Sequence, residues 1–212
     1  NTYYCVVGLS YKNADLSVRG RFSLNKSKTN LLLSRAKADG VEELMVISTC
    51  NRTELMGRVE NPEILINYLC TFSGGDPKLF SDKCYVLTNK AALHHVFRVG
   101  CGLESQIVGD FEIIGQLKKS FQNSKKHQMV NGFSERLVNA VTEQIKRVHH
   151  VSNLYYIPEQ GALAQHLVGE EAEHTCAHTH THTHTHTHTH THTHTYAAPR
   201  ARGSRTHLYV WG

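Results

Sequence analysis

The chain has 212 residues, of which 40% are hydrophobic, and a formal net charge of +5 at neutral pH. This length is sufficient for one ordinary domain with a buried core, and the mild positive charge permits an anionic partner without demanding one. No stretch approaches 18 consecutive apolar residues and no charged-then-apolar leader is seen, which argues against a membrane-spanning segment.

The first 150 residues contain both strand-like and helix-like patterns. Runs rich in β-branched and aromatic residues predict strands, and apolar residues at helical spacing between capping and stop signals predict helices. Because strands and helices are partly segregated along the chain, these patterns indicate an α+β domain with a mixed sheet and packed helices over residues 1–150. The predicted strands are 3–10, 41–49, 53–60 and 83–89, and the predicted helices are 25–40, 61–72, 90–99, 111–127 and 133–149.

Residues 151–212 have a different character, dominated by an uninterrupted alternation of His and Thr from His178 to Thr195. Such a repeat has no apolar face to offset the entropy of folding, so we predict a disordered, low-complexity tail. A CA dinucleotide repeat read in frame also encodes alternating His and Thr, which makes translated microsatellite sequence one origin of the tail. Neutral imidazoles bind divalent metals, but nothing here fixes a coordination number, so only adventitious binding is expected.

The six cysteines contain no Cys-x-x-Cys pair, a usage typical of thiols in a reducing compartment such as the cytosol or an organelle interior. Lys and Arg outnumber Asp and Glu by 20 to 14 in the first 150 residues, whereas the remainder has 3 against 4. The chain begins with Asn1 rather than Met, which indicates a fragment or a processed product.

The stretch "MVISTCNRTELMG" places Cys50 where a predicted strand runs into a turn, a common position for a nucleophile. Arg52 follows two residues later and could raise the thiolate fraction of Cys50 or hold a substrate carboxylate. The alternative is that Cys50 is a small apolar filler, as free cysteines often are.

Three blocks bear on this choice: "VVGLSYKNADLSVRGRFSL", "ISTCNRTELMG" and "HHVFRVGCGLESQIVGDFEIIGQLKKSF". In order and spacing they resemble the N-terminal catalytic domain of glutamyl-tRNA reductase. The resemblance implies attack of a cysteine thiolate on the ester of glutamyl-tRNA to form an enzyme thioester. Reduction by NADPH then releases glutamate-1-semialdehyde, a precursor of 5-aminolevulinate and of tetrapyrroles such as porphyrins.

The resemblance also implies roles for individual residues. Cys50 matches the nucleophile, and Thr49, Asn51 and Arg52 match positions around the glutamyl group, with Arg52 as the partner of its free carboxylate.

A second group of matching residues lies further along the chain. His95 matches a histidine important for activity, which orients or polarises the substrate or acts as a general base, and Ser105 matches a substrate-contacting serine. Without the resemblance, a helix histidine satisfied by a nearby carbonyl is the simpler interpretation of His95.

The loop after Ser105 matches a substrate-contacting stretch, represented here by Asp110, Phe111 and Glu112, with Gln116 beyond it. The chain departs from the commoner family pattern by having Asp110 in place of Glu and Glu112 in place of Gln. Glu112 therefore either contacts the substrate amino group or is not a site residue. Nearby lysines form a basic edge that is either solvated or used for tRNA phosphates, namely Lys118, Lys119, Lys125 and Lys126.

The likeness ends near residue 150, and no Gly-x-Gly-x-x-Gly motif follows. The NADPH-binding and dimerisation domains of the full-length family are therefore expected to be absent, together with hydride transfer and the family's homodimer. The expected activity is thioester formation followed by slow loss of glutamate to water. The family further implies glutamate-1-semialdehyde aminomutase as a partner and a cytoplasmic or plastid-stroma location. The alternative is a non-catalytic remnant that binds tRNA or, through its tail, divalent metal.

Overall fold

The computed structural model describes residues 2–107, 110 and 112–155. For residues 149–155 the description covers the backbone alone. Phe111 and the predicted His-Thr tail from residue 156 onward lie outside the described residues, so the predicted disorder of the tail stays a prediction.

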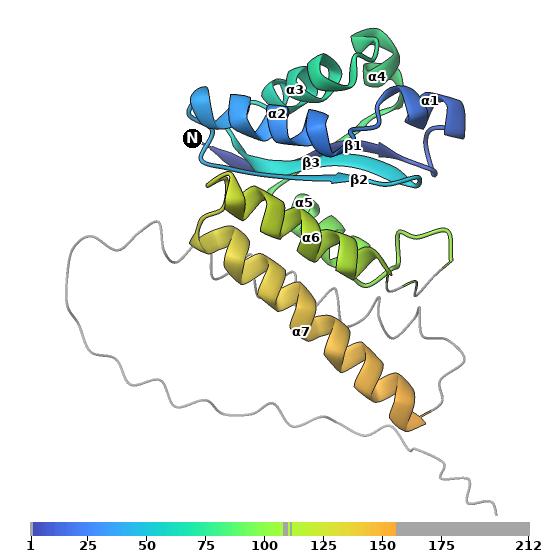
Figure 1. Ribbon diagram of the computed structural model, residues 1–212. Helices are drawn as coiled ribbons and strands as arrows, with labels where there is room; N and C mark the ends of the chain where they lie inside the picture. The colour runs from blue at the N-terminus through green and yellow to red at the C-terminus, as the bar shows by residue number, and fades with distance from the viewer. Residues whose placement is uncertain (1, 108–109, 111, 156–212) are drawn as a thin grey trace, which may run out of the picture.

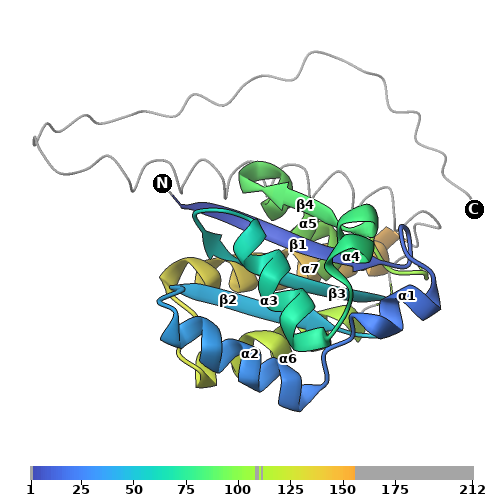
Figure 2. The ribbon, with the colours of Figure 1, turned by 90° about the horizontal axis from the view of Figure 1, so that it is seen from above.

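Four strands form one sheet in the order β2-β3-β1-β4 (Figure 2). Every pairing, β1 with β3, β1 with β4 and β2 with β3, is antiparallel. The α+β class is confirmed, but the prediction of a mixed sheet is wrong for these strands, because each neighbouring pair runs in opposite directions. The strands are β1 (Tyr3–Ser10), β2 (Glu43–Ser48), β3 (Arg52–Val59) and β4 (Tyr85–Thr88).

Seven helices accompany the sheet within the described residues. Five correspond to predicted helices, whereas α1 and α4 were not predicted because each is too short to show a helical apolar period. Both short helices begin at an aspartate whose side chain accepts a backbone hydrogen bond, Asp15 for α1 and Asp76 for α4. The helices are α1 (Leu16–Arg21), α2 (Lys26–Ala38), α3 (Glu63–Ser73), α4 (Pro77–Lys83), α5 (Asn89–Gly100), α6 (Glu112–Lys126) and α7 (Gly132–Tyr155).

The sheet is covered on both faces, by α1–α4 on one side and by α5–α7 on the other (Figure 1). Alternation along the strands assigns side chains to the two cores, since successive residues point to opposite faces. In β1, Val6 packs in the core with α5–α7 and Val7 packs in the core with α2–α4. In β3, Met56 faces α5–α7, so Arg52 and Glu54, which differ from it by even numbers, lie on that same face.

The end of the sheet at which β2 turns into β3 lies near the loop between α5 and α6 (Figure 1). A hydrogen bond from the Arg52 side chain to the carbonyl of Glu104 joins the two. This junction brings the "ISTCNRTELMG" block of the sequence next to the block that contains "GLES". Helix α7 continues to Tyr155, past the domain boundary predicted at residue 150. No helix among the described residues is both long and apolar enough to cross a bilayer.

Candidate active site

The turn between β2 and β3 presents Cys50 at its tip. The backbone N–H of Thr49 donates to the carbonyl of Arg52 at 2.8 Å, which closes the turn. The hydroxyl oxygen of Thr49 accepts from the backbone N–H groups of Asn51 and Arg52, each at 3.2 Å. Thr49 therefore shapes the turn from inside, as Ser and Thr side chains commonly do, while the next residue points outward.

Cys50 is the one exposed cysteine of the five in the described part of the chain. Burial raises the pKa of the Cys70 thiol to about 11 and that of the Cys101 thiol to about 12. It also raises the pKa of Cys5 and Cys84. Because the thiolate is the nucleophilic form, these four thiols are poor nucleophiles at neutral pH, and Cys50 is the accessible candidate.

Arg19 of α1 contacts the turn between β2 and β3 from the face of the sheet opposite to that of Arg52. Its Nε donates to the backbone carbonyl of Cys50 at 2.9 Å, and its Nη1 donates to the carbonyl of Ala14 at 2.6 Å. Two bonds from one planar group hold the Cys50 turn against the loop before α1. They also place a positive charge at the backbone carbonyl of Cys50.

Arg52 lies beneath the turn rather than at the surface, with a side chain that is 1% exposed. Its Nη1 donates to Oε1 of Glu54 at 2.9 Å, and its Nη2 donates to the carbonyl of Glu104. Its Nε is buried without a hydrogen-bond partner among the described residues. The guanidinium thus forms its contacts inside the protein. To bind Arg52, a substrate carboxylate would have to reach Nε, or the side chain would have to leave its present partners.

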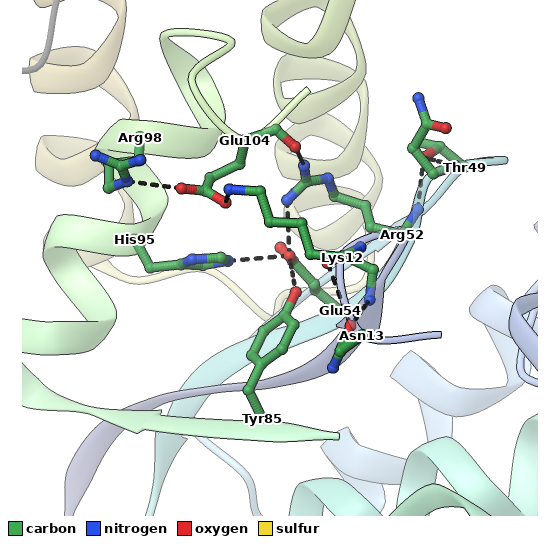
Figure 3. A network of polar contacts seen from close by, with 11 residues as sticks. Lys12, Asn13, Thr49, Arg52, Glu54, Tyr85, His95, Arg98 and Glu104 are labelled. Atoms are coloured by element: carbon green, nitrogen blue, oxygen red, sulfur yellow. Dashed lines mark hydrogen bonds and ion pairs between the residues drawn. The ribbon is translucent and has the colours of Figure 1, made fainter. Parts of the chain in front are cut away.

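Glu54 is the centre of a buried polar cluster (Figure 3). Its Oε1 accepts from Arg52 Nη1 and from the Tyr85 hydroxyl, and it lies 3.0 Å from Nε2 of His95. Burial by itself raises the pKa of this carboxyl, but the His95 ring, the Arg52 charge and the Tyr85 hydroxyl together lower it to about 2. Glu54 is therefore a carboxylate across the neutral range.

His95 is held in this cluster from α5, with a side chain that is 13% exposed. Its ring packs against Tyr85 of β4 with centroids 5.2 Å apart and planes at 57°. The simpler interpretation of His95 was a ring that bonds to a nearby carbonyl. The ring does have a protein partner, but this partner is the carboxylate of Glu54 and not a carbonyl.

A second carboxylate, Glu104, stabilises the loop that follows α5 (Figure 3). It forms ion pairs with Lys12, and with Arg98 at 2.6 Å. Its neighbour Ser105 is buried, and the Ser105 carbonyl accepts from the Tyr11 hydroxyl at 3.0 Å. These contacts connect the "GLES" block of the sequence to the chain that leaves β1.

The predicted residues beyond this loop separate in the structure. Asp110 Oδ1 accepts from the backbone N–H of Glu112 at 3.0 Å, so its side chain serves the start of α6. Glu112 is exposed in the first turn of α6, where its negative charge interacts favourably with the helix dipole. Gln116, one turn later, is half-buried and lines the same groove as Cys50.

The structure thus places the predicted residues at two neighbouring positions. Thr49, Cys50 and Gln116 line an open groove of about 750 Å³, whereas His95 lines a second cavity of about 510 Å³ together with Glu104. No hydrogen bond between Cys50 and His95 is found among the described residues.

Sequence reasoning missed the residues that organise the site: Arg19, Glu54, Tyr85 and Glu104. A signal existed for Glu54, because Arg52 and Glu54 carry opposite charges two residues apart on one strand, which places them on the same face where they can pair. Tyr85 and Arg19 had no such signal, since their partners are distant in sequence.

The fold and the site together define an α+β domain in which an antiparallel sheet lies between two helical layers and carries an exposed cysteine on a strand turn, near a buried charged cluster. A family model described as "Glutamyl-tRNAGlu reductase, N-terminal domain" matches residues 7–152. The chain belongs to this family.

Individual relatives agree with this assignment. The chain is 49% identical over 148 residues to glutamyl-tRNA reductase 2 of Flavobacterium johnsoniae, covering 70% of this chain and 34% of that protein. It is 47% identical over 152 residues to glutamyl-tRNA reductase of Christiangramia forsetii, covering 72% and 36%. Glutamyl-tRNA reductase from Methanopyrus kandleri shares the fold, with a TM-score of 0.59, 21% identity, and coverage of 72% of this chain and 35% of that one.

The chain spans about a third of the length of the curated relatives it matches. A reductase needs a hydride donor, and the family implies NADPH. The described residues do not fit a dinucleotide, because their strands pair only in antiparallel fashion and so provide no βαβ unit with a glycine-rich turn before a helix. No hydride step is assigned to them.

Proposed function

We propose that residues 1–150 form the thioester-forming catalytic domain of a glutamyl-tRNA reductase, with Cys50 as the nucleophile. The observation that carries the proposal is the exposure of Cys50 at a strand turn, while the other described thiols are buried or, for Cys84, half-buried. The substrate follows from the names of the relatives, which are glutamyl-tRNA reductases.

In the proposed step, the Cys50 thiolate attacks the ester carbonyl carbon of glutamyl-tRNA. A sulfur–carbon bond forms, the carbon–oxygen bond to the terminal ribose breaks, and the released ribose oxygen takes up a proton. Glutamate remains as a thioester, which water hydrolyses slowly when no hydride arrives. Arg19 and Thr49 hold the turn during this step. Glu54 holds Arg52 and His95 in place through its carboxylate.

The remaining associations are proposals at the level of the whole protein. Reduction of the thioester by NADPH, assembly into a homodimer and delivery of the semialdehyde to an aminomutase all require parts of the reductase outside residues 1–150. Unpaired thiols at all five described cysteines favour a reducing compartment, either the cytoplasm or an organelle interior such as the plastid stroma.

The test is incubation of the full chain with tRNA carrying radiolabelled glutamate, followed by RNase digestion and separation of the protein on an acidic denaturing gel. We expect a protein-bound label that hydroxylamine removes, as it does from thioesters. Cys50→Ser should abolish the label, whereas the matched control Cys84→Ser, at a half-buried thiol elsewhere, should retain it. The proposal fails if the native chain acquires no label or if the label persists in Cys50→Ser.

A further inference from the structure

The groove that contains Cys50 lies between the outer edge of β2, helix α6 and the start of α2. Ser120 of α6 donates to the carbonyl of Val46, and the backbone N–H of Leu44 donates to the carbonyl of Met129 at 2.9 Å. Residue numbers therefore rise along α6 as they fall along β2, so Gln116 lies toward Cys50 and Lys126 lies toward the far end. Ten residues of helix separate these two, a distance of about 15 Å.

The charge of this groove has one sign. Four lysines line it, and no Asp or Glu does so among the described residues: Lys26, Lys118, Lys119 and Lys126. Lys119 and Lys126 are seven residues apart, so they project from the same face of α6 two turns apart. Lys125 behaves differently, since it does not line the groove and pairs with Glu135 at 2.6 Å.

We propose that this groove binds the phosphates of the RNA strand whose terminal ester Cys50 attacks, an inference that rests on the function proposed above. The aminoacyl ester is attached to the 3′-terminal ribose, so the preceding nucleotides must lie along the protein when the ester reaches Cys50. A channel about 15 Å long with only positive charges suits a short single strand of negative phosphates.

The backbone around the groove argues against a peptide as the occupant. An extended peptide would add to β2 as a further strand and would need unpaired backbone groups along that edge. Two of those groups are already bonded, the N–H of Leu44 to Met129 and the carbonyl of Val46 to Ser120. These two groups are therefore unavailable to a pairing strand, while the lysine side chains that line the groove are exposed.

The test compares Lys119→Ala/Lys126→Ala with the matched control Lys125→Ala, each in the full chain. Affinity for fluorescently labelled, uncharged glutamate tRNA is measured by anisotropy between 50 and 200 mM KCl. Removal of two phosphate contacts should weaken binding roughly tenfold at 150 mM and reduce the slope of log affinity against log salt by about 1.4, or about 0.7 for each lysine. The control should leave both unchanged.

A second readout separates this inference from the proposed function. Thioester formation from glutamate α-ethyl ester, which carries no RNA, should be the same in the native chain and in the double variant. If the double variant binds tRNA with the native salt slope, the groove inference is overturned even though the thioester forms. If tRNA binding shifts as expected but neither ester labels the native chain, the proposed function fails and the groove stands as an RNA site alone.

Discussion

Nε2 of His95 lies 3.0 Å from Oε1 of Glu54, and the same oxygen accepts a hydrogen bond from Arg52. A residue of α5 and a residue of β3 that sequence motifs mark separately are thus joined through one buried carboxylate. Glu54 therefore fixes the side chains of both Arg52 and His95, and the effects expected of substitutions in the cluster follow from these contacts.

Replacing Glu54 should change how stability depends on pH. The pKa of Glu54 is about 2 in the folded chain, below its ordinary value of 4.5, so folding favours the charged form. Its contribution is complete above about pH 4.5 and is lost as the pH falls toward 2, an effect on the order of 3 kcal/mol. Urea unfolding of the native chain and of Glu54→Gln between pH 3 and 7 measures it. Equal pH dependence in the two would contradict the prediction.

His95 should act through position rather than by proton transfer, because it lines a different cavity from Cys50 and its Nε2 contacts Glu54. We expect His95→Gln to lower the rate of thioester formation by about tenfold while the shape of the pH–rate profile stays native. A general base would behave otherwise, since its removal costs about 100-fold or more and removes the corresponding limb of the profile. Single-turnover labelling between pH 5.5 and 8.5 distinguishes the two roles.

We predict that Arg19 positions the turn that carries Cys50. Arg19→Ala removes bonds to the carbonyls of Cys50 and Ala14, and we expect about tenfold slower thioester formation with little change in stability, because the side chain is partly exposed. Arg19→Lys should be equally slow, since one ammonium cannot reproduce the two-pronged contact. Arg21→Ala on the same helix is the control. Native rates in both Arg19 variants would refute the role.

Substitution of Gly8 tests how closely strands β1 and β3 must approach beside Glu54. A Cβ at Gly8 would lie 2.5 Å from the Thr53 carbonyl oxygen and 2.7 Å from Cγ of Glu54, both far inside contact distance. Gly8→Ala should therefore lower the free energy of unfolding by about 1–3 kcal/mol and slow thioester formation by displacing Glu54.

The control for this glycine is Gly20→Ala in α1, where an added Cβ meets nothing within 4 Å. We expect it to leave stability unchanged or slightly raised, since alanine favours a helix over glycine. Denaturant unfolding with the labelling assay measures both variants. A neutral Gly8→Ala would show that the two strands can separate at little cost.

Periodicity in the sequence determined the four strands and the five longer helices, because these depend on neighbours within a few residues, whereas local chemistry alone left open whether Cys50 is exposed or a small apolar filler. The "STCNRTE" motif marked the turn, and Thr49 closes it by local hydrogen bonds. The short turn between β2 and β3 requires these two strands to be antiparallel. The pairings of β1 with β3 and β4 were not predictable in this way, since they join strands across long connections.

Only the tertiary structure decided the partners of the charged groups. Arg52 and Glu54 pair within one strand, but Tyr85 and His95 reach Glu54 from 31 and 41 residues away, and Arg19 reaches Cys50 across 31. Likewise, the neighbours Lys125 and Lys126 differ only because α6 packs on β2 with one of them over the groove. A sequence lists charges in order, whereas burial and contact distance determine their partners, and both arise only when the sheet and helices pack together.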